Sequence, residues 1–217
     1  EADDAIGASD NHFTSTVDNL SALSTGTTTA GMYITETDTV AVDTVSVSVT
    51  EFTESAGTST VSDTAQSDLV SGNNGNIVLA ANGIITLNDG TDADGQAVNA
   101  NGSGNILIDA NTDNLDINSD ILSTTGHITL KAATDILVGD SSASGVDITT
   151  ATAGTISLDA EAGALTMAGD AAITATDSSL RLNATTDITV GNLLAQNIQT
   201  ILRNMNSINL PFNSILT

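Results

Sequence analysis

The sequence predicts an all-β protein, a right-handed parallel β-helix with three short strands in each rung and about 22–29 residues per rung. Three observations lead to this fold class. A seven-residue motif recurs five times, apolar and other residues alternate within it, and further apolar pairs follow each copy at similar intervals. Repeats of this length are typical of solenoids, in which each repeat buries its apolar side against its neighbours.

The motif begins at Gly75 as GNIVLAA and returns as GNILIDA at Gly104, GHITLKA at Gly126, GTISLDA at Gly154 and SSLRLNA at Ser178. Successive copies begin 29, 22, 28 and 24 residues apart. Within each copy three positions keep their character, and they lie two residues apart, as expected for one face of a strand. The first position holds Ile77, Ile106, Ile128, Ile156 and Leu180; the second holds Leu79, Ile108, Leu130, Leu158 and Leu182; the third holds Ala81, Ala110, Ala132, Ala160 and Ala184.

Two further apolar elements complete each repeat. A second pair follows every motif, as Ile85/Leu87, Leu115/Ile117, Ile136/Val138, Leu165/Met167 and Ile188/Val190, and a weaker third element lies around Val98, Ile121, Ile148 and Ile173. Gly, Asn, Asp and Ser separate these elements, as turns require. Three strands per repeat indicate a triangular cross-section. A leucine-rich repeat would need a helical segment, and a β-sandwich would not repeat identical columns.

The flanking segments predict four regions: a polar N-terminal arm with the first strands (1–30), atypical rungs with a polar loop (31–74), regular repeats (75–192), and a modified terminal rung or cap (193–217). We expect residues 1–12 to be flexible because they are polar. The alternation of Val40, Val42, Val45, Val47 and Val49 predicts further rung strands, and the Ser/Thr/Gly-rich segment 54–74 predicts an excursion.

The C-terminal segment allows two interpretations. Leu194, Ile198, Ile201, Met205 and Ile208 have the spacing of an amphipathic helix. The stretch NSINLPF from Asn206 instead aligns with GTISLDA, which would place Ile208 and Leu210 in the first two columns and Phe212 in the alanine position. We favour this modified sixth rung over a capping helix.

Charge excludes several classes of partner. The chain has 27 acidic residues, three basic residues and a formal net charge of −24. Binding to nucleic acid or to an anionic membrane surface requires cations, so neither is expected. No apolar run has the length of a membrane span, so membrane insertion is not expected. The absence of cysteine is compatible with a bacterial extracellular protein.

The order of the segments YITETD, SDLVSGNNGNIVLAANGIITLND, NSDILSTTGHITLKAATDI, GTISLDAEAGALTM and LRLNATTDITVG resembles the repeat units of giant filamentous-haemagglutinin-like bacterial surface adhesins. The resemblance covers residues 30–192. It implies a secreted parallel β-helix at the bacterial cell surface, serving as a non-catalytic structural or adhesive segment. No catalytic residues are implied, and the sequence departs from this pattern after Asn192.

Enzymatic chemistry is the main alternative, because some β-helices are polysaccharide lyases or hydrolases. Such enzymes need an acid/base pair, usually with a cation nearby and aromatic platforms for sugar rings. Only four aromatic residues are present, and they are scattered. Asp109, Lys131 and Asp159 share an outward column and form a conceivable catalytic trio. We expect Lys131 instead to relieve repulsion between two stacked carboxylates.

Ion and ice binding were also considered. The acidic stretch NDGTDADG gives Asp89, Asp92 and Asp94 as calcium candidates, but it lacks the ligand pattern of an EF-hand, and an acidic turn is the simpler interpretation. We therefore expect no cofactor, with Ca²⁺ as the alternative. His12 and His127 are isolated and predict no metal site. Ice binding would need a regular threonine array, which the mixed outward columns lack.

The last expectation concerns assembly. The terminal rung is apolar, with Ile208, Leu210, Phe212, Ile215 and Leu216. An uncovered solenoid end exposes unpaired backbone groups and core side chains. We therefore expect self-association end to end into a filament, or contact with neighbouring domains of a larger chain.

Overall fold

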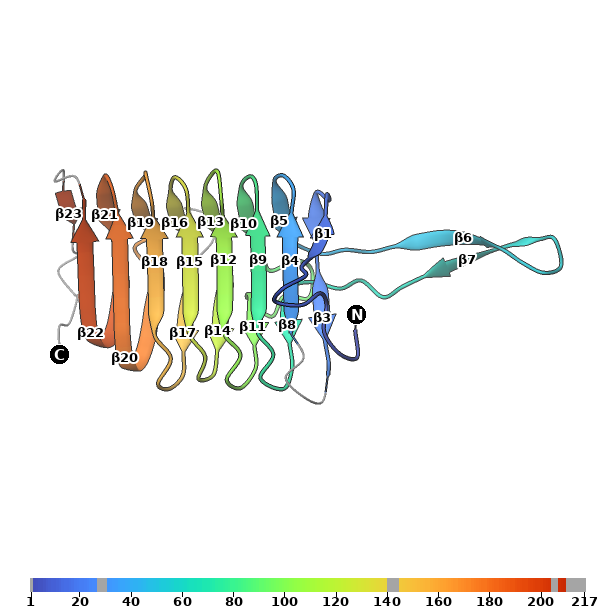
Figure 1. Ribbon diagram of the computed structural model, residues 1–217, viewed down its shortest axis with the longest axis horizontal. Helices are drawn as coiled ribbons and strands as arrows, with labels where there is room; N and C mark the ends of the chain where they lie inside the picture. Colours follow the sequence, from blue (N-terminus) through green and yellow to red (C-terminus); the bar gives the residue numbers. More distant parts are fainter. Residues whose placement is uncertain (1, 27–30, 140–144, 204–206, 210–217) are drawn as a thin grey trace.

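The structure is a computed structural model that describes residues 2–26, 31–139, 145–203 and 207–209. Within these residues the chain is all-β, without helices. Its strands lie side by side along the long axis of the molecule, from β1 at one end to β22 at the other (Figure 1). Apart from one hairpin, the strands pair in parallel, so the chain forms a solenoid-like stack.

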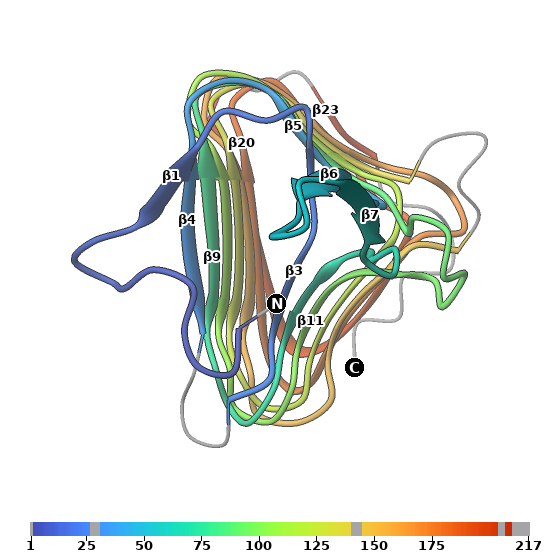
Figure 2. The same cartoon turned by 90° about the vertical axis from the view of Figure 1, so that its right-hand side faces the viewer.

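Three columns of strands run along the stack, and we name them A, B and C in the order in which the chain visits them. Column A contains β1 (Phe13–Ser15), β4 (Met32–Glu36), β9 (Ile77–Ala81), β12 (Ile106–Ala110), β15 (Ile128–Ala132), β18 (Ile156–Ala160) and the second parts of β20 (Ala172–Ala184) and β22 (Asn192–Leu202). Column B contains β2 (Asn19–Leu20), β5 (Val40–Val42), β10 (Ile85–Leu87), β13 (Leu115–Ile117), β16 (Ile136–Val138), β19 (Leu165–Met167), β21 (Asp187–Thr189) and β23 (Ser207–Asn209). Column C contains β3 (Ala22–Ser24), β8 (Leu69–Ser71), β11 (Gln96–Ala100), β14 (Asp120–Ser123), β17 (Asp147–Thr150) and the first parts of β20 and β22. Viewed along the stack, strands of one column lie behind one another around a common interior (Figure 2).

The predicted inward columns are confirmed. Leu79, Ile108, Leu130, Leu158 and Leu182 are register partners in successive strands of column A, and all are fully buried. The flanking first and third positions pair in the same register, as do the apolar residues predicted for columns B and C, apart from Val190, which follows the end of β21. The core is therefore a hydrophobic layer that is repeated in successive turns. Burial of each Leu or Ile side chain stabilises the folded state by about 1.5–3 kcal/mol.

Glycine begins the motif because two turns approach closely at the corner between columns C and A. A Cβ atom on Gly126 would lie 1.9 Å from the carbonyl oxygen of Gly104, and one on Gly154 would lie 2.1 Å from that of Gly126. A buried hydroxyl supports this corner. Ser123 Oγ donates to Gly104 O at 2.8 Å and accepts from Gly126 N at 3.0 Å. The repeat pattern of the sequence did not predict this role of the Ser123 hydroxyl group.

The described residues of the N-terminal arm, for which a flexible segment is expected, are paired with the first turns by backbone hydrogen bonds. Ala2 N donates to Leu23 O at 2.9 Å, and Ile6 N donates to Gly31 O at 2.9 Å. Tyr33 N in turn donates to Ile6 O at 2.8 Å. Backbone pairing compensates here for the small number of apolar side chains.

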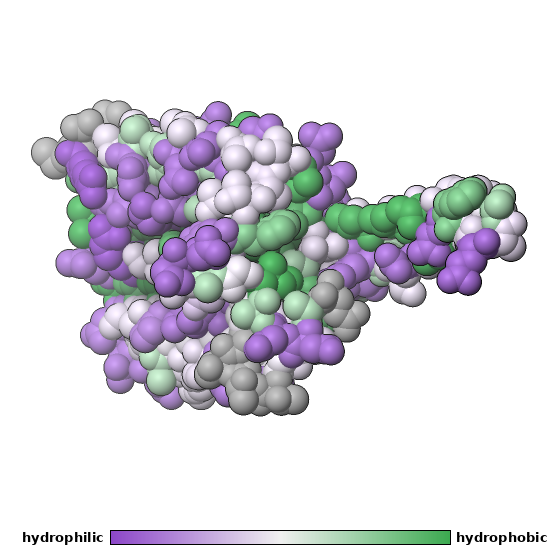
Figure 3. All heavy atoms as spheres, turned by 45° about the vertical axis from the view of Figure 1, so that its right-hand side comes forward, coloured by the Kyte–Doolittle hydropathy of each residue, from purple (hydrophilic) through white to green (hydrophobic). Residues whose placement is uncertain are grey.

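The excursion from the stack begins earlier than the polar loop predicted for residues 54–74. Val45 makes an isolated antiparallel bridge with Gln66, and between them β6 (Ser48–Phe52) and β7 (Thr58–Ser62) form an antiparallel hairpin. The hairpin extends beyond the N-terminal end of the stack (Figure 1). All residues of both strands are exposed, and the hairpin projects away from the body of the molecule (Figure 3).

The C-terminal prediction is confirmed as strand but wrong in register. Residues 192–202 form β22, not a helix, and Ile198 pairs with Leu180 in the first position of column A. This turn is therefore only 18 residues long, because β22 runs from column C into column A as one continuous strand. Ile208 pairs with Ile188 in column B. Leu210, Phe212, Ile215 and Leu216 lie outside the described residues.

Candidate functional site

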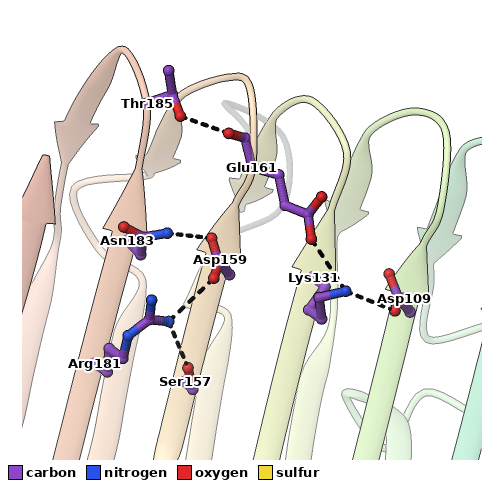
Figure 4. Close-up of polar contacts among 8 residues, drawn as sticks. All are labelled: Asp109, Lys131, Ser157, Asp159, Glu161, Arg181, Asn183 and Thr185. Carbon is purple, nitrogen blue, oxygen red and sulfur yellow. Dashed lines mark hydrogen bonds and ion pairs between the residues drawn. The ribbon is translucent and has the colours of Figure 1, made fainter. Parts of the chain in front are cut away.

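The outward face of column A carries the predicted Asp109, Lys131 and Asp159, but the three do not form one group. Lys131 Nζ lies 3.0 Å from Asp109 Oδ2 and 3.2 Å from Glu161 Oε1 (Figure 4). Asp159 Oδ2 instead pairs with Arg181 Nη1 at 3.2 Å. Lys131 thus relieves repulsion between two carboxylates, as expected, although Glu161 takes the place predicted for Asp159.

These ion pairs give Lys131 a fixed positive charge. The hydrogen bond to Asp109 is the largest cause that raises the pKa of Lys131, and the hydrogen bond to Glu161 acts in the same direction. A raised pKa favours the ammonium form. The side chain is about one-third exposed, so the pairs contribute little to stability, about 0–1 kcal/mol.

Corner side chains on column A connect neighbouring turns. Asn105 N donates to Asn76 Oδ1, and His127 N donates to Asn105 Oδ1, both at 2.9 Å. His127 Nδ1 lies 2.8 Å from Thr155 Oγ1 in the next turn. His12 Nδ1 lies 2.9 Å from Thr35 Oγ1, so each histidine pairs with a threonine of an adjacent turn, and the two histidines lie in different turns.

A second group of polar residues lies where the hairpin leaves the stack. The loop between β10 and β11 contains Asp92 and Asp94, and Asp68 immediately precedes β8 in the preceding turn. One carboxylate oxygen from each of these three residues lies within 4.8 Å of the other two. Asp92 and Asp94 are exposed, whereas Asp68 is 2 % exposed.

The structure therefore brings together two of the three predicted calcium candidates and adds a third residue, Asp68, that the sequence did not indicate. Asp89 is not part of this convergent group. Its Oδ1 accepts a hydrogen bond from Gly95 N at 2.8 Å and so closes the loop. Asp68 is 24 residues away from Asp92 in the sequence, and no local motif marks it.

Burial gives Asp68 an unusual electrostatic environment. Desolvation is the largest cause that raises its pKa, and the charges of Asp92 and Asp94 add to it, so the pKa of Asp68 reaches about 8. Asp68 Oδ1 is buried without a hydrogen-bond partner. An unsatisfied buried polar atom is costly, and Asn183 Oδ1 in column A is a second example. Asp68 differs from Asn183 in that two other carboxylates lie beside it.

The loop that carries Asp92 and Asp94 is attached to the hairpin base. Thr91 N donates to Thr44 Oγ1 at 2.7 Å, and Thr44 Oγ1 lies 2.9 Å from Ser67 Oγ. Gly90 has φ +76°, and a Cβ there would lie 2.5 Å from Ser67 Oγ. Two successive turns and the hairpin base therefore meet at the acidic group.

Two surface hollows lie over the last turns. One, of about 380 Å³, is lined by Thr155 and by residues of β18, β20 and β22 that include Ser157, Arg181 and Gln199, and no carboxylate contributes to it. The other, of about 260 Å³, includes one carboxylate, that of Asp177. Neither hollow contains the pair of carboxylates that glycoside hydrolysis normally uses.

Among the described residues no helix is long and apolar enough to cross a membrane. Comparisons of this chain with protein-family models, with curated proteins and with solved structures return no match.

Proposed function

We propose that this chain is a non-catalytic structural or adhesive segment, a right-handed parallel β-helix that adds length to an extracellular bacterial surface fibre. The observation that carries the proposal is the unbroken register of column A, in which the same inward positions stay apolar through successive turns. Right-handedness follows from the general rule for crossover connections between parallel strands. A long stack of this kind provides reach and a large polar surface.

The outward groups support a structural role. A lysine that acts as a general base needs a lowered pKa, whereas the neighbours of Lys131 raise it. Arg181 is engaged with Asp159, and the outward residues Asn76 and Asn105 bind the next turn. The face of column A therefore uses its functional groups to hold successive turns together.

Turnover on carbohydrates tests this proposal against the enzymatic alternative. The purified chain is incubated with acidic and neutral polysaccharides, and released reducing ends and unsaturated products are measured. We expect no release above that of a heat-denatured sample. Turnover that is lost in Lys131→Ala, and retained in the exposed control Asp38→Ala, would contradict the structural proposal.

Surface localisation and assembly belong to the same proposal. Within the described residues no strand pairs with the outer edges of β1 and β2, and such edges accept further strands. We expect end-to-end contact with another copy or with a neighbouring domain, through the apolar C-terminal residues Ile208, Leu210, Phe212, Ile215 and Leu216. Each added rung would lengthen the filament by about 4.8 Å.

Sedimentation velocity and electron microscopy test the assembly. A chain that forms filaments should become monomeric after deletion of residues 207–217. A wild-type chain that remains monomeric at high concentration, with no change after the deletion, would refute end-to-end association.

A further inference from the structure

We propose that Asp68, Asp92 and Asp94 bind one divalent cation of the calcium type, at the corner where the hairpin base meets the next turn. This inference is independent of the proposed structural function, because it depends only on the local geometry of the three carboxylates.

The separation of the oxygen atoms fits a single ion. Calcium–oxygen bonds measure about 2.3–2.6 Å, so two ligands of one ion are separated by at most about 5 Å. The three carboxylate oxygens all lie within 4.8 Å of one another. One calcium ion can therefore contact all three at once.

The ligand atoms also select the class of metal. All three are carboxylate oxygens, and neither histidine nor cysteine belongs to the group. Hard oxygen ligands favour Ca²⁺ or Mg²⁺ over Zn²⁺. Calcium accepts irregular coordination and more ligands than magnesium, and the exposed side of Asp92 and Asp94 gives water access to complete its shell.

The buried oxygen of Asp68 distinguishes this group from an ordinary acidic turn. Asp68 is 2 % exposed, and its Oδ1 has no hydrogen-bond partner. A buried carboxyl group beside two carboxylates is stabilised by a proton, or by a cation that displaces the proton. Lys131 and Arg181 pair with Asp109, Glu161 and Asp159, so they do not compensate Asp68.

A bound ion would join segments that are distant in the sequence. Asp68 ends the excursion that contains β6 and β7, and Asp92 and Asp94 belong to the loop that follows β10. Hydrogen bonds among Thr44, Ser67 and Thr91 already connect these segments. The ion would fix the hairpin base to the stack and so set the direction in which the hairpin points.

Calcium binding is measured by isothermal titration calorimetry on the full chain after treatment with EDTA. The buffer contains 150 mM NaCl, because salt screens the general attraction of cations to a protein with net charge −24. We expect one saturable Ca²⁺ per chain. The unfolding temperature should rise by about 5–10 °C when free Ca²⁺ is a hundredfold above its dissociation constant. Mg²⁺ at the same concentration should bind more weakly.

Variants identify the site. Asp68→Asn keeps the side-chain shape and removes the charge, and exposed Asp94→Asn serves as a second variant in case the first fails to fold. Either change should weaken Ca²⁺ binding tenfold or more. Asp116→Asn is the matched control, because Asp116 has acidic neighbours, Asp113 and Asp135, but does not belong to the convergent group.

Hydrogen exchange gives a readout independent of affinity. Ca²⁺ should slow exchange at residues 44–47, 64–68 and 88–95 and leave β12 and β15 unchanged. The absence of saturable binding by the wild-type chain would overturn the proposal. Equal weakening in Asp116→Asn and Asp94→Asn would overturn it as well, since binding would then follow net charge alone.

Discussion

Replacement of Gly126 by alanine tests the closest contact between two turns of the stack. Gly126 lies at the corner between columns C and A, beside the equivalent Gly104 of the previous turn. The added Cβ would lie 1.9 Å from the Gly104 carbonyl oxygen and 2.5 Å from its carbonyl carbon. Ordinary contact begins near 3.4 Å, so the two backbones would have to separate by more than 1 Å.

The free-energy cost of this substitution depends on the hydrogen bonds that hold the two backbones together. Thr125 N donates to Gly102 O, and Ile106 N donates to His127 O, both at 2.8 Å, on either side of the contact. Overpacking in a rigid interior costs about 1–3 kcal/mol, and weakening a ladder hydrogen bond adds about 1 kcal/mol. We expect Gly126→Ala to lose about 2–4 kcal/mol, which lowers the unfolding temperature of a chain of this size by about 4–16 °C.

Gly169 provides the matched control. Its φ is not in the left-handed region, and an added Cβ would meet no atom within 4 Å. Gly169→Ala should therefore be neutral, or stabilise the protein by as much as about 1 kcal/mol, because alanine restricts the unfolded chain. Both variants are compared with the wild-type chain by calorimetry and by urea unfolding followed by circular dichroism. If Gly126→Ala unfolds at the same temperature as Gly169→Ala, the turns are not as close as described here.

Three further predictions concern packing, charge and local stability. Ala132→Leu should destabilise the protein by about 1–3 kcal/mol in urea melts, because the buried alanine column has no spare volume. The outward substitution Thr129→Leu should cost little. Equal costs at the two positions would mean that the inward side of the strand is misassigned. Burial, with Asp113 and Asp135 nearby, raises the pKa of Asp116, so the folded state binds more protons than the unfolded state above pH 4. Stability of the wild-type chain should therefore fall relative to Asp116→Asn as the pH rises from 4 to 7, and a constant difference would contradict this. Residues 48–62 form a two-stranded hairpin with exposed strands, so their amide hydrogens should exchange much faster than those of β12 and β15. Comparable protection would show that the hairpin is covered by another part of the protein or by another molecule.

The repeated motif was enough to predict the register of the regular turns. Its inward positions are two residues apart, and glycine and alanine flank them, so each copy can align with the next in only one way. A shift by one residue would turn every apolar side chain to the solvent. For this reason the columns through Leu79, Leu130 and Leu182 are found as predicted.

The C-terminal register could not be predicted in the same way. An apolar–polar–apolar triplet occurs in both columns. In column B it is found, for example, at Ile85 to Leu87, and Ile208 also belongs to column B. Only the flanking glycine and alanine distinguish the two columns, and residues 206–212 have neither. The short turn through β22 was hidden because its corner position holds Gln196 instead of glycine, and the strand runs on through the corner.

The sequence by itself thus determined the repeating core, because turns that stack in register need the same types of residue at equivalent inward positions. Tertiary structure alone decided which segments lack a neighbour. Val45 and Val49 alternate like rung residues, yet they pair in antiparallel with Gln66 and Val61, outside the parallel stack. The convergence of Asp68 with Asp92 and Asp94 was likewise decided by tertiary structure, since it depends on how two turns meet across the hairpin base. Local periodicity reports which side of a strand is buried, whereas contacts between distant segments depend on the path that the chain takes around the stack.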